Sequence, residues 1–386
     1  MNTHSRRLVL ASLVSIGLLA TACGSDDSTS TTEAPSSTAA PASTDASATT
    51  AMPETTTAET TAPANLSATL SASGATFPKT FYEEAIASFT EANTGVKMTY
   101  GGGGSGKGRQ DLADQLVDWA GTDGTIKDED LPKFKGGDVL YFPTVVAPIT
   151  VSYNLDVEGL MLSADTIAKI FQVQITKWND PAIAAENPGV TLPDQAITVV
   201  HRSDSSGTTG NFTKFLEKAA GKDASGVWTL GTDSTVEWPA ATQAAEGNGG
   251  VASIISATKG AIGYVDLSDA TDAGLNFASV MNKAGSYVAP TLEGASAAAE
   301  GAELKDNLTY SAIWADGEAA YPITAQTWII AYKAQADAKK ADALKAFLTY
   351  VLTEGQTLAP EVNFAPLPSA IAEAALAQLD AFEVKA

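Results

Sequence analysis

The sequence is poor in the residues that cross-link chains or bind transition metals. Its 386 residues include a single cysteine, Cys23, and two histidines, His4 and His201. One cysteine cannot form an internal disulfide, and so few histidines and cysteines cannot supply a His/Cys metal cluster. We therefore expect neither a metal nor another cofactor.

Positive charge is also scarce. The chain has 23 Lys and Arg residues against 45 Asp and Glu, which gives a formal net charge of −22. Such a chain should repel nucleic acid, and it has no basic stripe with interleaved aromatic residues. A small anion is not excluded as a ligand, because surface charge is screened within about 8–10 Å at physiological salt.

Long apolar runs are absent except near the N-terminus. Arg6 and Arg7 precede an apolar run over residues 8–20, which is too short to span a membrane and is typical of a secretory signal. Ala22 stands directly before Cys23, as in a bacterial lipoprotein cleavage site, although Ala20 replaces the usual leucine. We expect a lipoprotein signal peptide at 1–22, and a lipid on Cys23 that anchors the protein to the outer face of the cell membrane. The alternative is an ordinary signal peptide with a free thiol.

The segment from 23 to 65 has almost no residue that could bury surface. It consists mainly of Ser, Thr, Ala and Pro, as in "STSTTEAPSSTAAPASTDASATT". This composition predicts a disordered tether. The remaining residues, 66–386, are long enough for one large folded domain or two.

Helix and strand patterns alternate along residues 66–386. Apolar residues recur at helical spacing from Phe81 to Phe89, and Ser163 can cap a helix. We expect a further helix over 109–115. Strands are predicted at 96–100, 117–120, 145–153, 197–201, 261–266 and 323–332. This alternation favours an α/β fold with largely parallel sheets.

Motifs for enzymatic catalysis are weak. His201, Asp204 and Ser206 are the residue types of a serine triad, but they lie within six consecutive residues, and no G-x-S-x-G motif is present. The stretch "YGGGGSGKGR" satisfies a Walker A motif except at Gly108, where a hydroxyl should bind magnesium. No Walker B aspartate accompanies it, so an ATP site is disfavoured.

Loops rich in glycine and hydroxyl residues occur where a strand is followed by a helix. They are "SGATFP" at 73–78, the glycine loop with Ser105, and "RSDSSGT" at 202–208. Helix N-termini carry unpaired N–H groups and partial positive charge, so each loop is a potential oxyanion cradle. Serine and threonine at such positions are also ordinary helix caps. Their recurrence, with Arg202 opening the last loop, favours a polydentate anion site.

Several segments in order resemble the periplasmic phosphate-binding proteins of phosphate ABC transporters. They include "SGATFPKTFYEEAIASF", "GGGGSGKGRQDLADQLVDWAGTD", "KWNDPAI", "ITVVHRSDSSGTTGNF", "AIGYVD" and "YPITAQTWII", and they span essentially all of 66–386. The resemblance implies an α/β fold of the type 2 periplasmic-binding-protein class, with two lobes, a hinge and a ligand cleft between them. Residues 66–150 and 321–386 would form lobe 1, and residues 151–320 lobe 2.

The resemblance also implies a ligand set and partners. Asp204 matches the acid that pairs with the family's arginine. Lys107, Arg109 and His201 depart from the family pattern around the site. The family's phosphate contacts fall on Thr76, Phe77, Ser105, Asp123, Arg202, Ser206, Gly207 and Thr208. The expected protein is a monomer that binds inorganic phosphate and delivers it to a membrane permease, and it is not an enzyme.

These residue types suit phosphate on physical grounds. Near neutral pH phosphate retains a proton, whereas sulfate does not, so the Asp123 carboxylate can accept a hydrogen bond from phosphate but only repel sulfate. Arg202 can bind two ligand oxygens, and hydroxyl and main-chain donors complete the cage. The alternative for Asp123 is a helix cap. Two alternative functions remain: a secreted phosphoester hydrolase using Ser206 or Thr208, and a surface adhesin on a Ser/Thr stalk.

Overall fold

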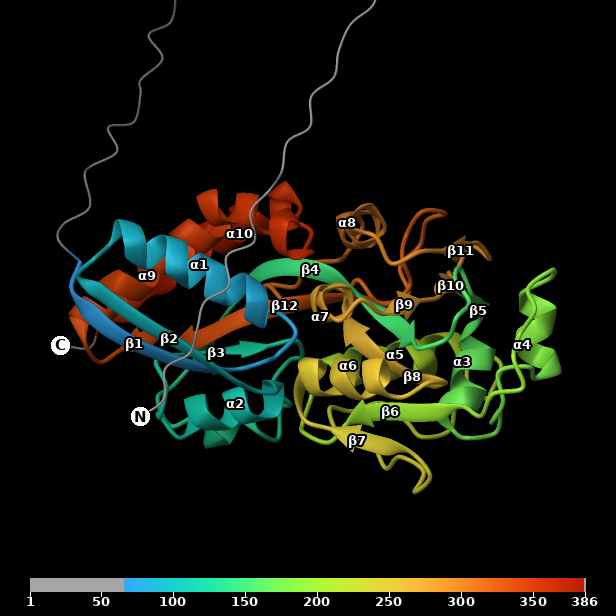
Figure 1. Ribbon diagram of the computed structural model, residues 1–386. Coiled ribbons are helices and arrows are strands. Elements are labelled where there is room, and N and C mark those ends of the chain that lie inside the picture. Colours follow the sequence, from blue (N-terminus) through green and yellow to red (C-terminus); the bar gives the residue numbers. More distant parts are fainter. Residues whose placement is uncertain (1–65, 385–386) are drawn as a thin grey trace, which may run out of the picture. The chain divides into compact units, whose positions relative to one another are not determined.

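The structure, a computed structural model, describes residues 66–384 (Figure 1). The predicted signal peptide, the lipid-bearing Cys23 and the predicted tether lie outside these residues. In the described part, none of the helices has the length and apolar character needed to cross a membrane. No cluster of three or more His, Cys, Asp or Glu residues placed to bind a metal occurs in 66–384.

Strands and helices alternate over most of the described chain. The strands are β1 (Ala68–Gly74), β2 (Val96–Gly103), β3 (Trp119–Thr122), β4 (Val139–Tyr153), β5 (Met161–Leu162), β6 (Thr198–Arg202), β7 (Gln243–Ala245), β8 (Ala261–Asp266), β9 (Asn276–Phe277), β10 (Ser279–Met281), β11 (Tyr287–Val288), β12 (Thr324–Tyr332), β13 (Ala334–Gln335) and β14 (Glu383–Val384). The α-helices are α1 (Lys79–Ala92), α2 (Ser105–Ala113), α3 (Ala164–Phe171), α4 (Pro181–Glu186), α5 (Gly207–Ala220), α6 (Gly247–Ala257), α7 (Leu267–Asp272), α8 (Leu292–Glu300), α9 (Ala338–Leu352) and α10 (Ser369–Gln378).

The main sheet has the strand order β2-β1-β3-β12-β4-β8-β6-β7, with β9 pairing with β4. β4 links the two halves of this order, because its first part pairs with β12 and its last five residues pair with β8. β4 and β12 are almost entirely buried, as expected for strands covered on both faces. Helices lie on both sides of β1 and β2, with α1 and α9 on one side and α2 on the other (Figure 1).

The sheet is mixed, which corrects the prediction of largely parallel sheets. β1 runs parallel to β2 and β3, and β6 runs parallel to β7 and β8. In the centre, β12 is antiparallel to β3 and β4, and β4 is antiparallel to β8. A strand buried on both faces has the same apolar pattern whichever way its neighbour runs, so the sequence does not reveal strand direction.

The helices after the glycine-rich loops begin earlier than the sequence suggests. α2 starts at Ser105 instead of 109, and α5 starts at Gly207, before the helical pattern of residues 211–216 in the sequence. Glycine disfavours helix, but a Cβ on Gly108 would lie 2.6 Å from the Cα of Gly74 and 2.9 Å from the carbonyl oxygen of Gly121. Close packing of α2 on β1 and β3 therefore requires glycine within the helix. The predicted cap at Ser163 is confirmed, because its hydroxyl accepts a hydrogen bond from the Thr166 N–H.

The topology brings the three glycine-rich loops to one place. Each follows the carboxyl end of a strand: β1 before α1, β2 before α2, and β6 before α5. In open α/β sheets, ligands bind outside the carboxyl ends of such strands. The N-terminus of α6, which follows β7, also joins this region, because the Asn248 N–H donates to Thr76 Oγ1 at 3.3 Å.

Candidate functional site

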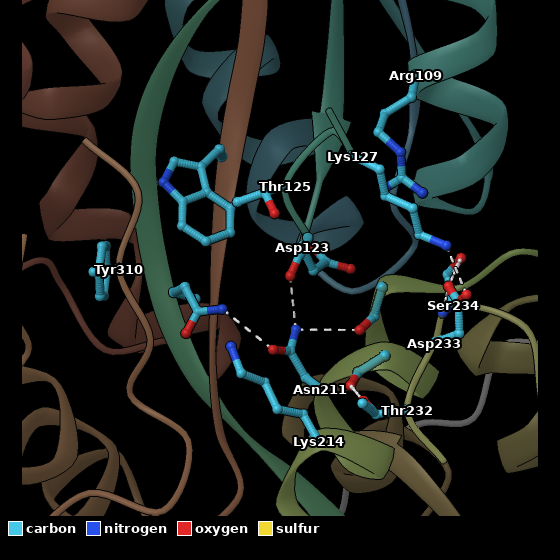
Figure 2. Close-up of a pocket in the computed structure, with 15 residues that line it drawn as sticks. Arg109, Asp123, Thr125, Lys127, Asn211, Lys214, Thr232, Asp233, Ser234 and Tyr310 are labelled. Carbon is cyan, nitrogen blue, oxygen red and sulfur yellow. Dashed lines mark hydrogen bonds and ion pairs between the residues drawn. The ribbon is translucent and has the colours of Figure 1, made fainter. Parts of the chain in front are cut away.

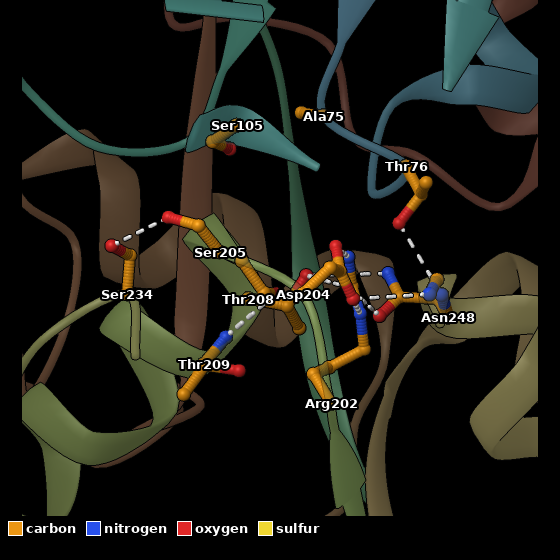
Figure 3. Close-up of polar contacts among 12 residues, drawn as sticks. Ala75, Thr76, Ser105, Arg202, Asp204, Ser205, Thr208, Thr209, Ser234 and Asn248 are labelled. Atoms are coloured by element: carbon orange, nitrogen blue, oxygen red, sulfur yellow. Dashed lines mark hydrogen bonds and ion pairs between the residues drawn. The ribbon is translucent and has the colours of Figure 1, made fainter. Parts of the chain in front are cut away.

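The loop before α2 and the loop before α5 contact each other directly (Figure 3). The Gly106 N–H donates to the carbonyl oxygen of Ser205 at 2.9 Å. Gly104 adopts φ 89°, and a Cβ there would lie 2.3 Å from Asp204 Oδ2. Only glycine tolerates both the positive φ and this close approach. The glycine run therefore lets the backbone reach the loop of Arg202 without a side chain between them.

Ser105 and Asp123 form the part of the site contributed by α2 and β3. Ser105 is the first residue of α2, and Asp123 immediately follows β3. The Ser105 hydroxyl donates to Asp123 Oδ2 at 3.2 Å and accepts from the Asp123 N–H at 3.1 Å. Both residues are buried. Asp123 thus serves as an internal acceptor, and the alternative of a helix cap fails because no helix starts there.

Arg202 and Asp204 form a two-bond ion pair. Arg202 Nε donates to Asp204 Oδ1 at 2.7 Å, and Nη2 donates to Asp204 Oδ2. The Arg202 side chain is only 1% exposed. Burial alone would raise the pKa of Asp204, but the hydrogen bonds and charge of Arg202 outweigh it and lower that pKa. The predicted pairing of these residues is thus present in the structure, and it fixes the guanidinium.

The start of α5 supplies hydroxyl and main-chain donors. Ser206 is the N-cap, and its Oγ accepts from the Thr209 N–H at 3.1 Å. Its hydroxyl hydrogen is not used by this bond and can still be donated. The N–H groups of Gly207 and Thr208 lie in the first turn and have no helix carbonyl as a partner. These donors give the helix N-terminus an affinity for negative charge.

Asn248, at the start of α6, connects the site residues and was missed by the sequence analysis. Its Oδ1 accepts from Arg202 Nη1 at 2.7 Å, and its Nδ2 donates to Thr208 Oγ1 at 3.2 Å and to Asp266 Oδ2 at 2.8 Å. Its own N–H bonds to Thr76. The sequence did contain a signal for this residue. The glycine-rich segment "EGNGG" also joins a strand to a helix, but it carries an amide side chain where the other loops carry hydroxyls.

Phe77 contributes through its main chain alone. Its side chain is 1% exposed and packs edge-to-face on Phe364 with a centroid separation of 5.8 Å. The ring therefore belongs to the hydrophobic core. A ligand could contact only the Phe77 N–H.

The environment of Asp123 raises its pKa from 3.8 to about 6. Burial is the main cause, and it is opposed by hydrogen bonds and by positive charge. Thr327 of β12 donates to Asp123 Oδ1 at 2.7 Å, and the charges of Arg202 and Arg109 act in the same direction. Thr327 was also missed, because it lies within an apolar strand far along the chain. The carboxyl group is consequently mostly ionised at neutral pH and easily protonated below it.

His201, Lys107 and Arg109, also noted in the sequence, each have a partner within the described chain. His201 Nδ1 donates to the Arg202 carbonyl at 2.9 Å, and its ring stacks on Trp238. Burial lowers the pKa of His201, and in residues 66–384 no hydrogen bond joins it to Ser206. Lys107 is exposed and pairs with Asp111 at 2.5 Å. Arg109, by contrast, points inward and donates to Thr122 Oγ1 at 2.9 Å.

Hydrogen bonds link Thr76, Arg202 and Thr208 through Asn248, and close contacts bring Ser105, Asp123 and Gly207 together. A pocket of about 230 Å³ adjoins Asp123 and Gly207 (Figure 2). The pocket shares Asp123 and Gly207 with the site. It is otherwise lined by Arg109, Gly124, Thr125, Lys127, Gly210, Asn211, Lys214, Thr232, Asp233, Ser234, Tyr310, Gln326 and Trp328.

Comparison with known proteins places this geometry in a family. Residues 37–354 match the model of the PBP superfamily domain. The chain is 36% identical over 320 residues to the phosphate-binding protein PstS of Pasteurella multocida, covering 80% of this chain and 89% of that protein. It is also 36% identical over 334 residues to the PstS of Methanocaldococcus jannaschii, covering 80% of this chain and 84% of that protein.

Solved structures share the fold. A high-affinity periplasmic phosphate-binding protein bound with phosphate superposes with a TM-score of 0.67 at 23% identity, covering 81% of this chain and 94% of that one. A phosphate-binding protein from Stenotrophomonas maltophilia gives a TM-score of 0.64 at 22% identity, covering 80% and 93%. The predicted type 2 periplasmic-binding-protein fold is thereby confirmed. The chain belongs to the PstS family of phosphate-binding proteins, within the PBP superfamily.

Proposed function

We propose that this protein binds inorganic phosphate outside the cell and delivers it to an ABC-type phosphate permease. One observation carries the proposal: a buried carboxylate, Asp123, faces a set of hydroxyl, guanidinium and helix N-terminal donors. The names of the relatives, phosphate-binding proteins PstS, support the same ligand.

The donor set suits a compact anion with several oxygen atoms. The ligands we propose are Thr76, Phe77, Ser105, Asp123, Arg202, Ser206, Gly207 and Thr208. Arg202 provides charge and is held by Asp204 and Asn248, which do not themselves need to touch the anion. The hydroxyl oxygens of Thr76 and Thr208 accept hydrogen bonds within the protein, so their own hydrogens can be donated to a ligand.

Asp123 would provide selectivity through its hydrogen bonds. Its Oδ2 accepts a hydrogen bond from the Ser105 hydroxyl. When phosphate binds, the Ser105 hydroxyl can turn to a phosphate oxygen, and Oδ2 then accepts the hydrogen of a phosphate P–OH group. Sulfate carries no such hydrogen, so it would leave the buried carboxylate facing another negative charge. A buried unpaired charge of this kind costs several kcal/mol, roughly a thousandfold or more in affinity.

In residues 66–384, neither hydroxyl of the hydrolase alternative is hydrogen-bonded to a carboxylate or an imidazole. Ser206 caps α5, and Thr208 Oγ1 contacts Arg202 and Asn248, neither of which accepts a proton at neutral pH. The relatives are named as phosphate-binding proteins, and we infer that this chain is likewise a binding protein instead of an enzyme. Purified protein should therefore release no phosphate from a phosphomonoester, with or without divalent metal.

The placement at the membrane follows from the sequence. We infer a lipid anchor on Cys23, a tether over 23–65 and a monomeric domain whose lobes are 66–150 with 321–386, and 151–320. The ATP-hydrolysing step then belongs to another subunit on the cytoplasmic side. Mass spectrometry of the mature N-terminus would show a diacylglyceryl group on Cys23, and an unmodified thiol would refute the anchor.

Calorimetric titration with phosphate, arsenate and sulfate tests the ligand. Phosphate and arsenate, which both retain a proton, should bind at one site, and sulfate should bind at least about a thousandfold more weakly. Arg202→Ala should lose most of the phosphate affinity. Equal binding of sulfate and phosphate by the wild-type protein would refute the selectivity assigned to Asp123.

Asp123→Asn isolates the selective carboxylate. The amide carries no charge, so sulfate should gain affinity relative to phosphate by about tenfold or more. Asp233→Asn is the matched control, because Asp233 also lines the adjoining pocket but pairs with Lys127. A selectivity that changes equally in both variants would assign the effect to general charge and not to Asp123.

A further inference from the structure

Asp266, the last residue of β8, is a buried acid outside the proposed ligand set. It is 1% exposed. The hydrogen bonds that its carboxylate accepts within residues 66–384 come from neutral groups: the Asp269 N–H at 3.0 Å and the Asn248 amide at 2.8 Å. Burial raises the pKa of Asp266 well above its usual range, and the charge of nearby Asp269 acts in the same direction. Burying an acid without a cation is costly, so an acid at this position needs a physical reason.

Capping of α7 explains only one of the two carboxylate oxygens. Asp266 Oδ1 accepts from the Asp269 N–H, as the side chain of an N-cap residue does. Serine caps a helix about as well as aspartate, threonine nearly as well, and neither brings a charge into the interior. The feature that these shorter side chains lack is the second oxygen. In the described chain, Oδ2 of Asp266 accepts from Nδ2 of Asn248.

Asn248 lies beside Arg202 in Figure 3 and connects Asp266 to two of the proposed phosphate ligands. Its Oδ1 accepts from Arg202 Nη1 at 2.7 Å, and its Nδ2 donates to Thr208 Oγ1 at 3.2 Å as well as to Asp266. All four residues are at most 4% exposed. Bulk water therefore does not readily replace a partner that one of them loses.

The hydrogen bonds around Asn248 require one orientation of its amide. Arg202 can only donate, so it must face the amide oxygen, and the NH₂ group then points away from it. A threonine hydroxyl can donate or accept, so Thr208 does not select an orientation by itself. Asp266 supplies an acceptor for the NH₂ group. It thereby favours the orientation in which Arg202 is held and Thr208 receives a hydrogen bond, which leaves the Thr208 hydrogen for an anion.

We propose that Asp266 is a positioning residue of the phosphate site, which acts through Asn248 to fix Arg202 and Thr208. The inference rests on the proposed function, because Arg202 and Thr208 are two of the proposed phosphate ligands. The sign of the effect is distinctive. A negative charge near an anion site should weaken binding through repulsion, whereas a residue that positions the donors strengthens it.

Calorimetric titration of the full chain with phosphate tests this role in Asp266→Ser. Serine keeps an N-cap oxygen for α7 but removes the acceptor of Asn248. Phosphate affinity should fall about 5–10-fold, which corresponds to one buried hydrogen bond. Asp266→Thr fills more of the space of the carboxylate and should show the same loss, so it serves if Asp266→Ser folds poorly. Unchanged or increased affinity in these variants overturns the proposal.

Asp269→Asn is the matched control for the removal of an acid at the start of α7. It keeps the Asp269 N–H, and with it the cap and the bond from Asn248 to Asp266. Phosphate affinity should stay within about twofold of wild type. An equal loss in Asp269→Asn and Asp266→Ser would assign the effect to α7 in general and would refute a specific role of Asp266.

The Asn248→Ala background separates positioning from a general loss of stability. Without the Asn248 amide, Asp266 no longer has its connection to Arg202 and Thr208. Asp266→Ser should then reduce phosphate affinity by less than about twofold further. A purely structural defect would add its full effect, so a further 5–10-fold loss in this background contradicts the proposal.

Titrations of the wild type and of Arg202→Ala show whether the proposed function itself holds. Phosphate binding that is present in the wild type and mostly lost in Arg202→Ala establishes the site, and the Asp266 variants then test positioning alone. If the wild type binds no phosphate, the proposed function fails, and a crystal structure of Asp266→Ser still decides the geometry. The contact between Asn248 Oδ1 and Arg202 Nη1 should be lengthened or broken, and an unaltered contact would refute the positioning role.

Discussion

At the scale of single residues, Asp123 combines a negative charge with nearly complete burial. Its pKa rises from 3.8 to about 6, mainly because burial disfavours the charged form. The folded protein therefore binds this proton more tightly than the unfolded chain does. Its contribution to stability is present at low pH and is lost as the pH rises from about 4 through 6.

Asp123→Asn should remove this pH dependence. In protein without added phosphate, the variant should gain about 2.4 kcal/mol of stability relative to wild type between pH 4 and pH 8, which follows from a pKa of 3.8 in the unfolded chain and about 6 in the folded protein. Urea unfolding at both pH values measures it. Asp233→Asn should show almost no difference between these pH values, since Lys127 lowers the pKa of Asp233 and its titration therefore falls below pH 4. If the stability of Asp123→Asn relative to wild type were the same at both pH values, the raised pKa of buried Asp123 would be contradicted.

Asn248 acts at the residue scale by positioning other side chains. Its amide orients Arg202 and Thr208, and it is 0% exposed. Asn248→Ala should weaken phosphate binding about 10–100-fold and destabilise the fold by about 1–3 kcal/mol. Combined with Arg202→Ala, it should add less to the loss of affinity than it does alone, because part of its effect acts through Arg202.

Asn282→Ala is the control for the loss of a buried amide. Asn282 is 2% exposed and donates to main-chain carbonyls at Gly317, Glu318 and Ala320, away from the site. It should lower stability and leave phosphate affinity intact. If both variants lowered affinity equally, the role of Asn248 would be structural only.

At the scale of elements, the site depends on how closely α5 approaches α2 and β3. Gly207→Ala should lower phosphate affinity about 100-fold or more, because its Cβ would displace Ser105 and Asp123. Gly210→Ala lies one turn further along α5, where a Cβ would meet no atom closer than 3.7 Å. It should be neutral for binding and stabilise the helix by up to about 1 kcal/mol. Calorimetry and thermal unfolding of both variants separate these effects.

At the scale of the whole molecule, the proposed ligands come from distant parts of the chain, from Thr76 to Thr208. Phosphate should therefore stabilise the whole folded unit, by about 2.7 kcal/mol at a hundredfold excess over Kd. Differential scanning calorimetry should show Tm rising with phosphate concentration. The same concentration of sulfate should shift Tm far less, and Arg202→Ala should show almost no response. A phosphate-independent Tm in the wild type would exclude specific binding to the folded state.

Much of the fold and the site could be predicted from residue patterns. The predictable features are local, because their hydrogen-bonding partners lie within a few residues of each other. They are the hydroxyl-rich loops, the pair of Arg202 and Asp204, and the helix cap at Ser163. The structure links Thr76, Arg202 and Thr208 through Asn248 and brings Ser105 beside Asp123. The first residues of α2 and α5 could not be predicted, because a glycine-rich segment has the sequence pattern of a loop. Tertiary packing stabilises these segments as helix.

The sequence alone determined which elements form and which chemical groups stand at their ends. Local hydrogen bonding and apolar periodicity involve residues close together in the chain, so both can be predicted from the sequence. Only the tertiary structure decided that β4 and β12 run antiparallel to their neighbours, and that Thr327 and Asn248 join the site. These depend on contacts between residues far apart in sequence, and no local pattern encodes such contacts.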